Sequence, residues 1–289
     1  MRFNIRLVEY YNTATIAIYN DEVGTDDDYE RPKPSKREDK VPKGKEIIEC
    51  PFTGIAMEVE IIEDPEETFR DKMNSLESSI KRSKRNVLRL IRSMNMENAY
   101  FVTLTFDKTK VDRTDFVKCC KKTRVWLQNL RKQPGAENMS FLCVPELHKD
   151  MTSWHSHCIL CDVGDIKLTD SNHKDRTGRT IYNLDKWRYG FSTAVRISSD
   201  PESSIKLAKY VTKYFTKESG MIAHNKHRYF ASRNIPKPRV RKWHYEDYID
   251  ADRILEEIYK EGYQKVASNI YQGYMEVEYI DAIKIGKEG

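Results

Sequence analysis

The stretch WHSHCIL, residues 154–160, places two histidines one residue apart inside an apolar segment that predicts a buried strand. Because side chains at positions i and i+2 of a strand point to the same face of a sheet, the imidazoles of His155 and His157 lie side by side. Ser156 and Cys158 point to the other face. Two neutral imidazoles in this arrangement form half of a metal site; the alternative is a pair of partly buried, hydrogen-bonded histidines.

A second apolar strand, MSFLCVPELH at residues 139–148, precedes this one, and the turn KDMTS between them predicts a hairpin. Across the turn, Glu146 is well placed to be a third ligand, and His148 is its rival on the same side. Two imidazoles, a carboxylate and open positions suit Mg²⁺ or Mn²⁺ acting on a phosphate. The spacing of Cys158 and Cys161 does not favour structural zinc, because positions i and i+3 of a strand face opposite ways.

A helix is predicted where Asp200-Pro201 opens SSIKLAKYVTKYFTKE, and its pattern continues to about Ser219. At about 100° per residue, one side of this helix is apolar and another is basic. Tyr210 and Tyr214 are four residues apart and lie together on the border between the two sides. Their rings can pack on the core while their hydroxyls reach a groove lined with ammonium groups. The apolar side has Leu207, Ala208, Val211 and Phe215, and the basic side has Lys206, Lys213 and Lys217, with Lys209 beside it.

Charge is distributed unevenly near this helix. Residues 200–245 contain eleven Lys and Arg against three Asp and Glu, and residues 246–289 contain five against eleven. A basic segment of this kind fits a polyanion-binding surface, although an ordinary solvated face is the alternative. A phenol with a pKa of about 10 is a poor nucleophile at neutral pH, but nearby lysines favour phenolate. A metal site, a Tyr/Lys helix and a basic surface together indicate phosphodiester transfer to tyrosine; alone, the tyrosines read as amphipathic border residues.

The remaining segments predict an α+β fold with a central, mainly antiparallel sheet flanked by helices. AYFVTLTFD, residues 99–107, is rich in aromatic and β-branched residues and predicts a central strand. Helices are predicted at residues 72–95 and 114–132. Residues 164–185 are polar and typical of a loop, and KWRYGFSTAVRIS after them indicates a strand pair or one bent strand.

The bulk composition describes a globular chain with a heavily charged surface, 39% hydrophobic and 33% charged. No apolar run approaches the ~20 residues that cross a bilayer, and the N-terminal segment has no apolar signal-peptide core. The six cysteines of the chain do not have the spacing of a disulfide scaffold. We therefore expect a cytoplasmic protein that has no membrane partner.

Three motifs together resemble the HUH endonucleases, and most closely the rolling-circle replication initiators of plasmids and single-stranded DNA phages. They are FVTLTFD at residues 101–107, PELHKD…WHSH at 145–157 and YVTKY at 210–214, in the family's order. The resemblance covers about Ala99 to Ser219, with a weaker likeness in HRYFASRNIPKP. One departure is Ser156, where the family usually has a bulky apolar residue between the histidines.

The motifs and the composition together imply a domain organisation, and the resemblance implies a mechanism and its site residues. The HUH endonuclease domain spans residues 71–245 and nicks and rejoins single-stranded or hairpin origin DNA through a 5′-phosphotyrosine. Residues 1–70 form an N-terminal extension with a flexible charged linker at about 21–45. Residues 246–289 form an acidic C-terminal segment packed on the core. The catalytic residues are Tyr210, Tyr214 and Lys213, and the metal ligands are His155, His157 and Glu146, for Mg²⁺ or Mn²⁺.

DNA contacts are expected from cations of the basic segment, by backbone recognition. No GxxxxGK[ST] phosphate loop occurs in the chain, so a host or element helicase is expected as a partner, together with a DNA polymerase in a bacterial cell. A conjugative relaxase or an HUH transposase is the nearest alternative, and a non-enzymatic DNA-binding regulator on a nuclease-like fold is an alternative from another class. The expected DNA-binding residues are Lys206, Lys209, Lys217, Arg228, Arg233, Lys237 and Arg239.

Overall fold

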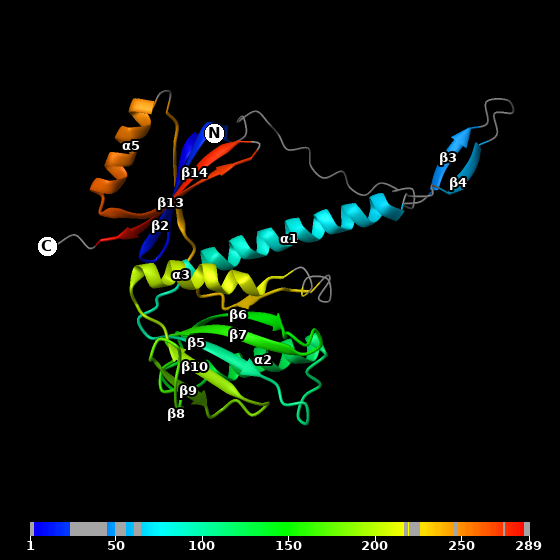
Figure 1. Cartoon of the computed structure of the whole chain (residues 1–289), viewed down its shortest axis with the longest axis vertical. Helices are drawn as coiled ribbons and strands as arrows, with labels where there is room; N and C mark the ends of the chain where they lie inside the picture. Colours follow the sequence, from blue (N-terminus) through cyan, green and yellow to red (C-terminus); the bar gives the residue numbers. More distant parts are fainter. Residues whose placement is uncertain are drawn as a thin grey trace.

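The computed structural model has the α+β architecture that the sequence predicts, with two large antiparallel sheets and helices packed on them (Figure 1). In the part of the chain that it describes, no helix is both long and apolar enough to cross a membrane. The described residues are 3–23, 45–49, 56–60, 65–216, 219, 226–245, 248–273 and 275–285.

The larger sheet has seven strands in the order β11-β6-β7-β5-β10-β9-β8, and all neighbours are antiparallel. Strand β5 lies in the middle of this order, which confirms the predicted central strand. The predicted hairpin is also confirmed, because β6 pairs with β7 and Glu146 is opposite His155. The strands are β5 (Ala99–Thr105), β6 (Ser140–Leu147), β7 (Trp154–Cys161), β8 (Leu168–Lys174), β9 (Thr180–Leu184), β10 (Ser192–Arg196) and β11 (Phe230–Ala231).

The segment 164–185 was predicted as a loop, and this prediction is wrong. It forms the hairpin β8–β9 at one edge of the sheet. Strand β8 is mostly exposed and has polar side chains on both faces, so it lacks the alternation that marks a half-buried strand. The following segment contributes one strand, β10, and Trp187 before it packs in the core between Phe106 and Trp126.

Helices cover both faces of the seven-stranded sheet (Figure 1). Helix α1 (Pro65–Ser93), helix α3 (Pro201–Val211) and the 3₁₀ turn η1 (Thr212–Tyr214) cover one face. Helix α2 (Phe116–Leu130) covers the other, and Asp115 caps its first turn by accepting a hydrogen bond from the Lys118 amide. The predicted α3 was too long, since the regular helix ends at Val211 and Tyr214 lies on the 3₁₀ turn.

Each face of the sheet has its own apolar core. Alternation along β7 divides the strand between them: Ile159 packs toward α1 and α3, whereas Cys158 and Leu160 pack toward α2. The histidines share the face of Ile159, as predicted. The α1/α3 core includes Leu76, Ile80, Val87, Ile91, Leu142, Val144, Ala208, Val211 and Phe215, and the α2 core includes Val102, Leu104, Phe106, Trp126, Leu127, Leu130, Cys143 and Trp154.

A second sheet joins the two ends of the chain. Its order is β12-β1-β2-β14-β13, all antiparallel, so strands from residues 3–23 pair with strands after residue 238. Helix α5 packs on one face of it around Ile5, Leu7, Ile16 and Ile258. The elements are β1 (Phe3–Glu9), β2 (Thr13–Val23), β12 (Arg239–Trp243), α5 (Tyr248–Lys260), β13 (Tyr263–Gln272) and β14 (Glu276–Lys284).

A small hairpin of β3 (Lys45–Glu49) and β4 (Ala56–Glu60) precedes α1. It corresponds to the hairpin-like piece that the sequence indicates, although its turn lies outside the described residues. Residues 24–44, most of the predicted linker, also lie outside them.

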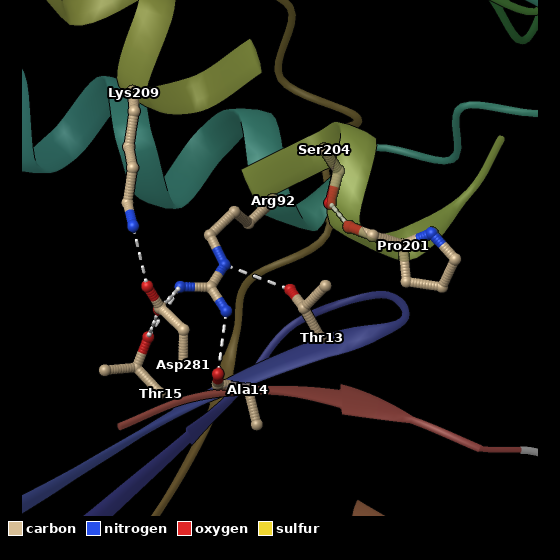
Figure 2. A network of polar contacts seen from close by, with 8 residues as sticks. All are labelled: Thr13, Ala14, Thr15, Arg92, Pro201, Ser204, Lys209 and Asp281. Carbon is tan, nitrogen blue, oxygen red and sulfur yellow. Dashed lines mark hydrogen bonds and ion pairs between the residues drawn. The ribbon is translucent and has the colours of Figure 1, made fainter. Parts of the chain in front are cut away.

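Arg92, near the end of α1, joins this helix to the second sheet (Figure 2). Its side chain is 2% exposed. The guanidinium donates from Nη1 to Asp281 Oδ1 at 2.7 Å, from Nη2 to the Ala14 carbonyl at 2.7 Å and from Nε to Thr13 Oγ1 at 3.0 Å. Asp281 also binds Lys209 of α3, with Nζ and Oδ2 3.1 Å apart. One carboxylate of β14 therefore contacts both helices that cover the histidine face of the larger sheet.

Candidate active site

Strands β5 and β7 hold the two histidines through a pair of threonines. Thr103 is opposite His157 and Thr105 is opposite His155 in the antiparallel register. Thr103 Oγ1 lies 3.1 Å from His157 Nδ1, and Thr105 Oγ1 lies 3.3 Å from His155 Nδ1. Because each Nδ1 has a hydroxyl partner, Nε2 is the ring nitrogen left for a ligand or a proton. The Thr-Leu-Thr spacing of β5 thus matches the His-Ser-His spacing of β7.

Glu146 and His148 contact different histidines. Glu146 Oε2 lies 2.5 Å from His157 Nε2. The His148 ring stacks on the His155 ring, with centroids 4.7 Å apart and planes 11° from parallel. The structure therefore brings the predicted third ligand and its rival to the same site.

Burial lowers the pKa of His155 below its usual 6.5, and the positive charges that His148 and His157 carry when protonated lower it further. Neutral imidazole is the form that binds metal ions. Among the side chains that the structure describes, no group of three or more His, Cys, Asp or Glu is arranged to hold a metal ion. The donor types are nevertheless those that bind metal ions: a carboxylate adjoins an imidazole Nε2, and the threonines contact the Nδ1 atoms as outer hydrogen-bond partners of ligating histidines do.

Both predicted tyrosines reach this site from α3 and η1. The Tyr214 ring stacks on the His157 ring at a centroid distance of 3.9 Å, with 4° between the planes. Tyr210 lies beside it, at 5.5 Å from the Tyr214 ring and 5.9 Å from the Phe101 ring, both edge to face. Tyr210 is 47% exposed, whereas Tyr214 is half-buried. The two phenols therefore share one site but differ in their access to solvent.

Burial raises the pKa of Tyr214 well above 10, and a hydrogen bond between the Tyr214 and Tyr210 hydroxyls raises it further. A protonated Tyr214 hydroxyl is a donor that can stabilise negative charge on Tyr210. Lys213 is exposed, and its Nζ lies 6.0 Å from the centre of the Tyr210 ring. This places a cation beside the more exposed tyrosine.

Residues 99–219 match a family model described as replication-associated protein ORF2. The match supports a role in DNA replication for the part of the chain that carries the histidines, Glu146 and both tyrosines. Helix α1 and the second sheet lie outside it. No curated protein and no solved structure is significantly similar to the chain.

Ser156, the departure from the family pattern, has a polar partner on the opposite face. Its Oγ lies 3.1 Å from Thr123 Oγ1 of α2, and both residues are buried. Thr123 Oγ1 also donates to the Cys119 carbonyl at 3.1 Å, so the serine hydroxyl donates to the threonine. At this one position, a hydroxyl pair between β7 and α2 takes the place of the apolar side chain that the family usually has.

Thr123→Val is expected to reduce the free energy of unfolding by ~1 kcal/mol, because Ser156 keeps only the weak Cys143 thiol as a partner. The double variant Thr123→Val, Ser156→Ala is expected to lose less than the sum of the single variants, since no buried hydroxyl remains. Urea unfolding of the four proteins measures this coupling. Strict additivity would mean that the pair contributes nothing.

The predicted DNA-binding cations lie on several elements, and some of them have acidic or polar partners. Lys206 pairs with Glu202 on the exposed side of α3, at 2.9 Å, and Lys209 pairs with Asp281. Arg228 donates to Ser79 Oγ of α1 at 2.7 Å. Arg239 is on β12 in the second sheet. Of the rest, Arg233 and Lys237 are exposed, and Lys217 lies outside the described residues.

Thr103, Thr105 and Phe101 belong to the site but were absent from the residues selected by sequence. The signal was present in FVTLT, because Thr103 and Thr105 are two residues apart on a strand, as the two histidines are on theirs. Only the register of β5 against β7 shows that each hydroxyl is opposite an imidazole.

Proposed function

We propose that this protein is a rolling-circle replication initiator that nicks and rejoins single-stranded origin DNA through a 5′-phosphotyrosine. The observation that carries the proposal is the meeting of both histidines, Glu146 and two tyrosines in one site, with the Tyr214 ring 3.9 Å from the His157 ring. Two tyrosines suit two successive transfers, one that opens the strand and one that closes it. The match to a replication-associated family supports the same reading.

The chemistry is an exchange of phosphodiesters. A tyrosine oxygen forms a bond to phosphorus, the bond from phosphorus to the 3′ oxygen breaks, and that oxygen takes a proton while the phenol loses one. The hydroxyl of the second tyrosine donates to the attacking oxygen, and Lys213 adds positive charge beside Tyr210. Mg²⁺ or Mn²⁺ held by His155, His157 and Glu146 would supply a Lewis acid for the phosphate. The free 3′ hydroxyl then primes a DNA polymerase, and a helicase partner unwinds the duplex.

The test is incubation of the full chain with labelled single-stranded DNA and Mn²⁺, followed by denaturation in SDS. A covalent protein–DNA adduct is expected. DNA binding without an adduct would instead favour a non-enzymatic regulator on this fold. A relaxase or transposase would also form the adduct, because both share this chemistry.

His155→Ala combined with His157→Ala is expected to abolish the Mn²⁺-dependent adduct and to leave non-specific DNA binding largely intact, because the imidazoles bind the ion rather than the DNA backbone. Adduct yield with and without a chelator, alongside filter binding, measures the two effects. Thr152→Ala, in the exposed turn between β6 and β7, is a matched control. Equal wild-type cleavage with and without chelator would contradict a role for a metal.

A further inference from the structure

A hollow of about 490 Å³ lies beside the candidate active site, on the same face of the larger sheet. Its lining includes Thr193 and Val195 of β10, and Phe101 and Thr103 of β5. Helix α3 lines it with Tyr210 among other residues. The hollow therefore shares Thr103 with the histidine pair and Tyr210 with the tyrosine pair. Its volume lies in the range of small-molecule sites.

The charges of this hollow do not suit a phosphate. It has two cations, Arg179 and Lys206, and each is already paired with an acid. Arg179 Nη2 lies 2.7 Å from Asp175 Oδ2, and Lys206 Nζ lies 2.9 Å from Glu202 Oε2. The nearly neutral lining favours an uncharged ligand over an anion.

The remaining lining suits a flat ligand that makes hydrogen bonds at its edge. Phe101 and Tyr210 meet edge to face, with ring centres 5.9 Å apart, and form an aromatic corner. Hydroxyls of Thr193, Ser198 and Ser203 add donors and acceptors to the lining. Nucleobases stack on aromatic rings and bind hydroxyls through their edges.

We propose that this hollow binds one unpaired nucleobase of the DNA strand, next to the phosphate that is attacked. The inference rests on the proposed function for its substrate, since the base belongs to the strand that Tyr210 or Tyr214 joins. Tyr210 both lines the hollow and is a candidate nucleophile. The position of the bound base therefore fixes which phosphate lies over the histidine pair. The hollow is then a determinant of the cleavage position.

The first experiment measures affinity without cleavage, in EDTA. The probes are a short thymidine oligonucleotide and an abasic strand with the same number of phosphates. The wild type is expected to bind the first at least fivefold more tightly, as a stacked base contributes about 1–3 kcal/mol. Thr193→Met, at an exposed position, and Thr193→Met with Val195→Met fill the hollow and are expected to reduce this ratio without changing affinity for the abasic strand.

Ser268→Met, at an exposed position of β13 in the second sheet, is the matched control and is expected to keep the wild-type ratio. If both hollow-filling variants kept the wild-type ratio of affinities for the thymidine and abasic strands, the proposal would be overturned. Circular dichroism confirms that each variant is folded.

The second experiment uses a randomised single-stranded pool with Mn²⁺ and sequences the DNA recovered in covalent adducts. The wild type is expected to select a base at one position next to the linkage, and the double variant to lose selection there alone. If the double variant formed adducts with the same base selection as the wild type, the role of the hollow would be contradicted and the proposed function would stand. A wild type without adducts would contradict the proposed function, and the affinity ratios would then decide on the hollow by themselves.

Discussion

The double variant Tyr210→Phe, Tyr214→Phe is expected to form no SDS-stable adduct with single-stranded DNA, a loss of roughly 10³-fold or more, as when a nucleophile is removed from a covalent enzyme. Phenylalanine keeps the ring that stacks on His157 and removes only the hydroxyl. Both hydroxyls lie at the site, so each single variant is expected to reduce adduct formation or rejoining without abolishing both. Gel quantification of adduct and of rejoined circles measures the two steps.

Tyr271→Phe is a matched control, because Tyr271 is 64% exposed on β13 and lies outside the site. Cleavage by the double variant at the wild-type rate would show that the nucleophile is elsewhere. Loss of DNA binding in the double variant would instead assign the phenols to recognition.

Arg92→Met is expected to reduce the free energy of unfolding by ~3–5 kcal/mol, because it removes one partner of a buried ion pair and leaves Thr13 and the Ala14 carbonyl without the guanidinium donor. Lys209 still neutralises part of the Asp281 charge, so the lower end of the range is expected. Chemical unfolding measures the loss. Arg85→Met, at an exposed position of the same helix, is the control and is expected to change stability by less than about 0.5 kcal/mol.

The same network predicts a loss of stability in acid. Burial raises the pKa of Asp281, but Arg92 and Lys209 outweigh it and hold the pKa below 3.8. A carboxyl with a depressed folded-state pKa contributes stability above its unfolded value, and this contribution is lost as pH falls below 3.8. In the Asp281→Asn variant, the free energy of unfolding is therefore expected to fall less steeply as the pH is lowered through this range. If Arg92→Met reduced the free energy of unfolding by less than about 1 kcal/mol, the network would not stabilise the contact between α1 and the second sheet.

Local patterns predicted the parts of the site that lie on one strand or one helix. Alternation placed His155 and His157 on one face, and helical periodicity placed Tyr210 beside Tyr214. The turn KDMTS placed Glu146 near them. These inferences needed only the period of a single element and one short connection.

Contacts between distant segments were beyond such patterns. Lys209 pairs with Asp281, 72 residues away, and no local pattern predicts that partner. Residues 3–23 pair with β12 and β14 across most of the chain, and no local period encodes that partner choice. The edge hairpin β8–β9 was missed for a different reason, because strand β8 is polar on both faces and carries no apolar alternation.

Identification of the DNA-linked residue by mass spectrometry tests the central claim most directly. The sequence K-YVTK-YFTK means that trypsin separates Tyr210 and Tyr214 into different peptides. After incubation with single-stranded DNA and Mn²⁺, nuclease trimming and tryptic digestion, a nucleotide is expected on one or both of these peptides. A nucleotide on any other residue, or intact DNA binding with no linked peptide, would contradict the assignment of these tyrosines as nucleophiles.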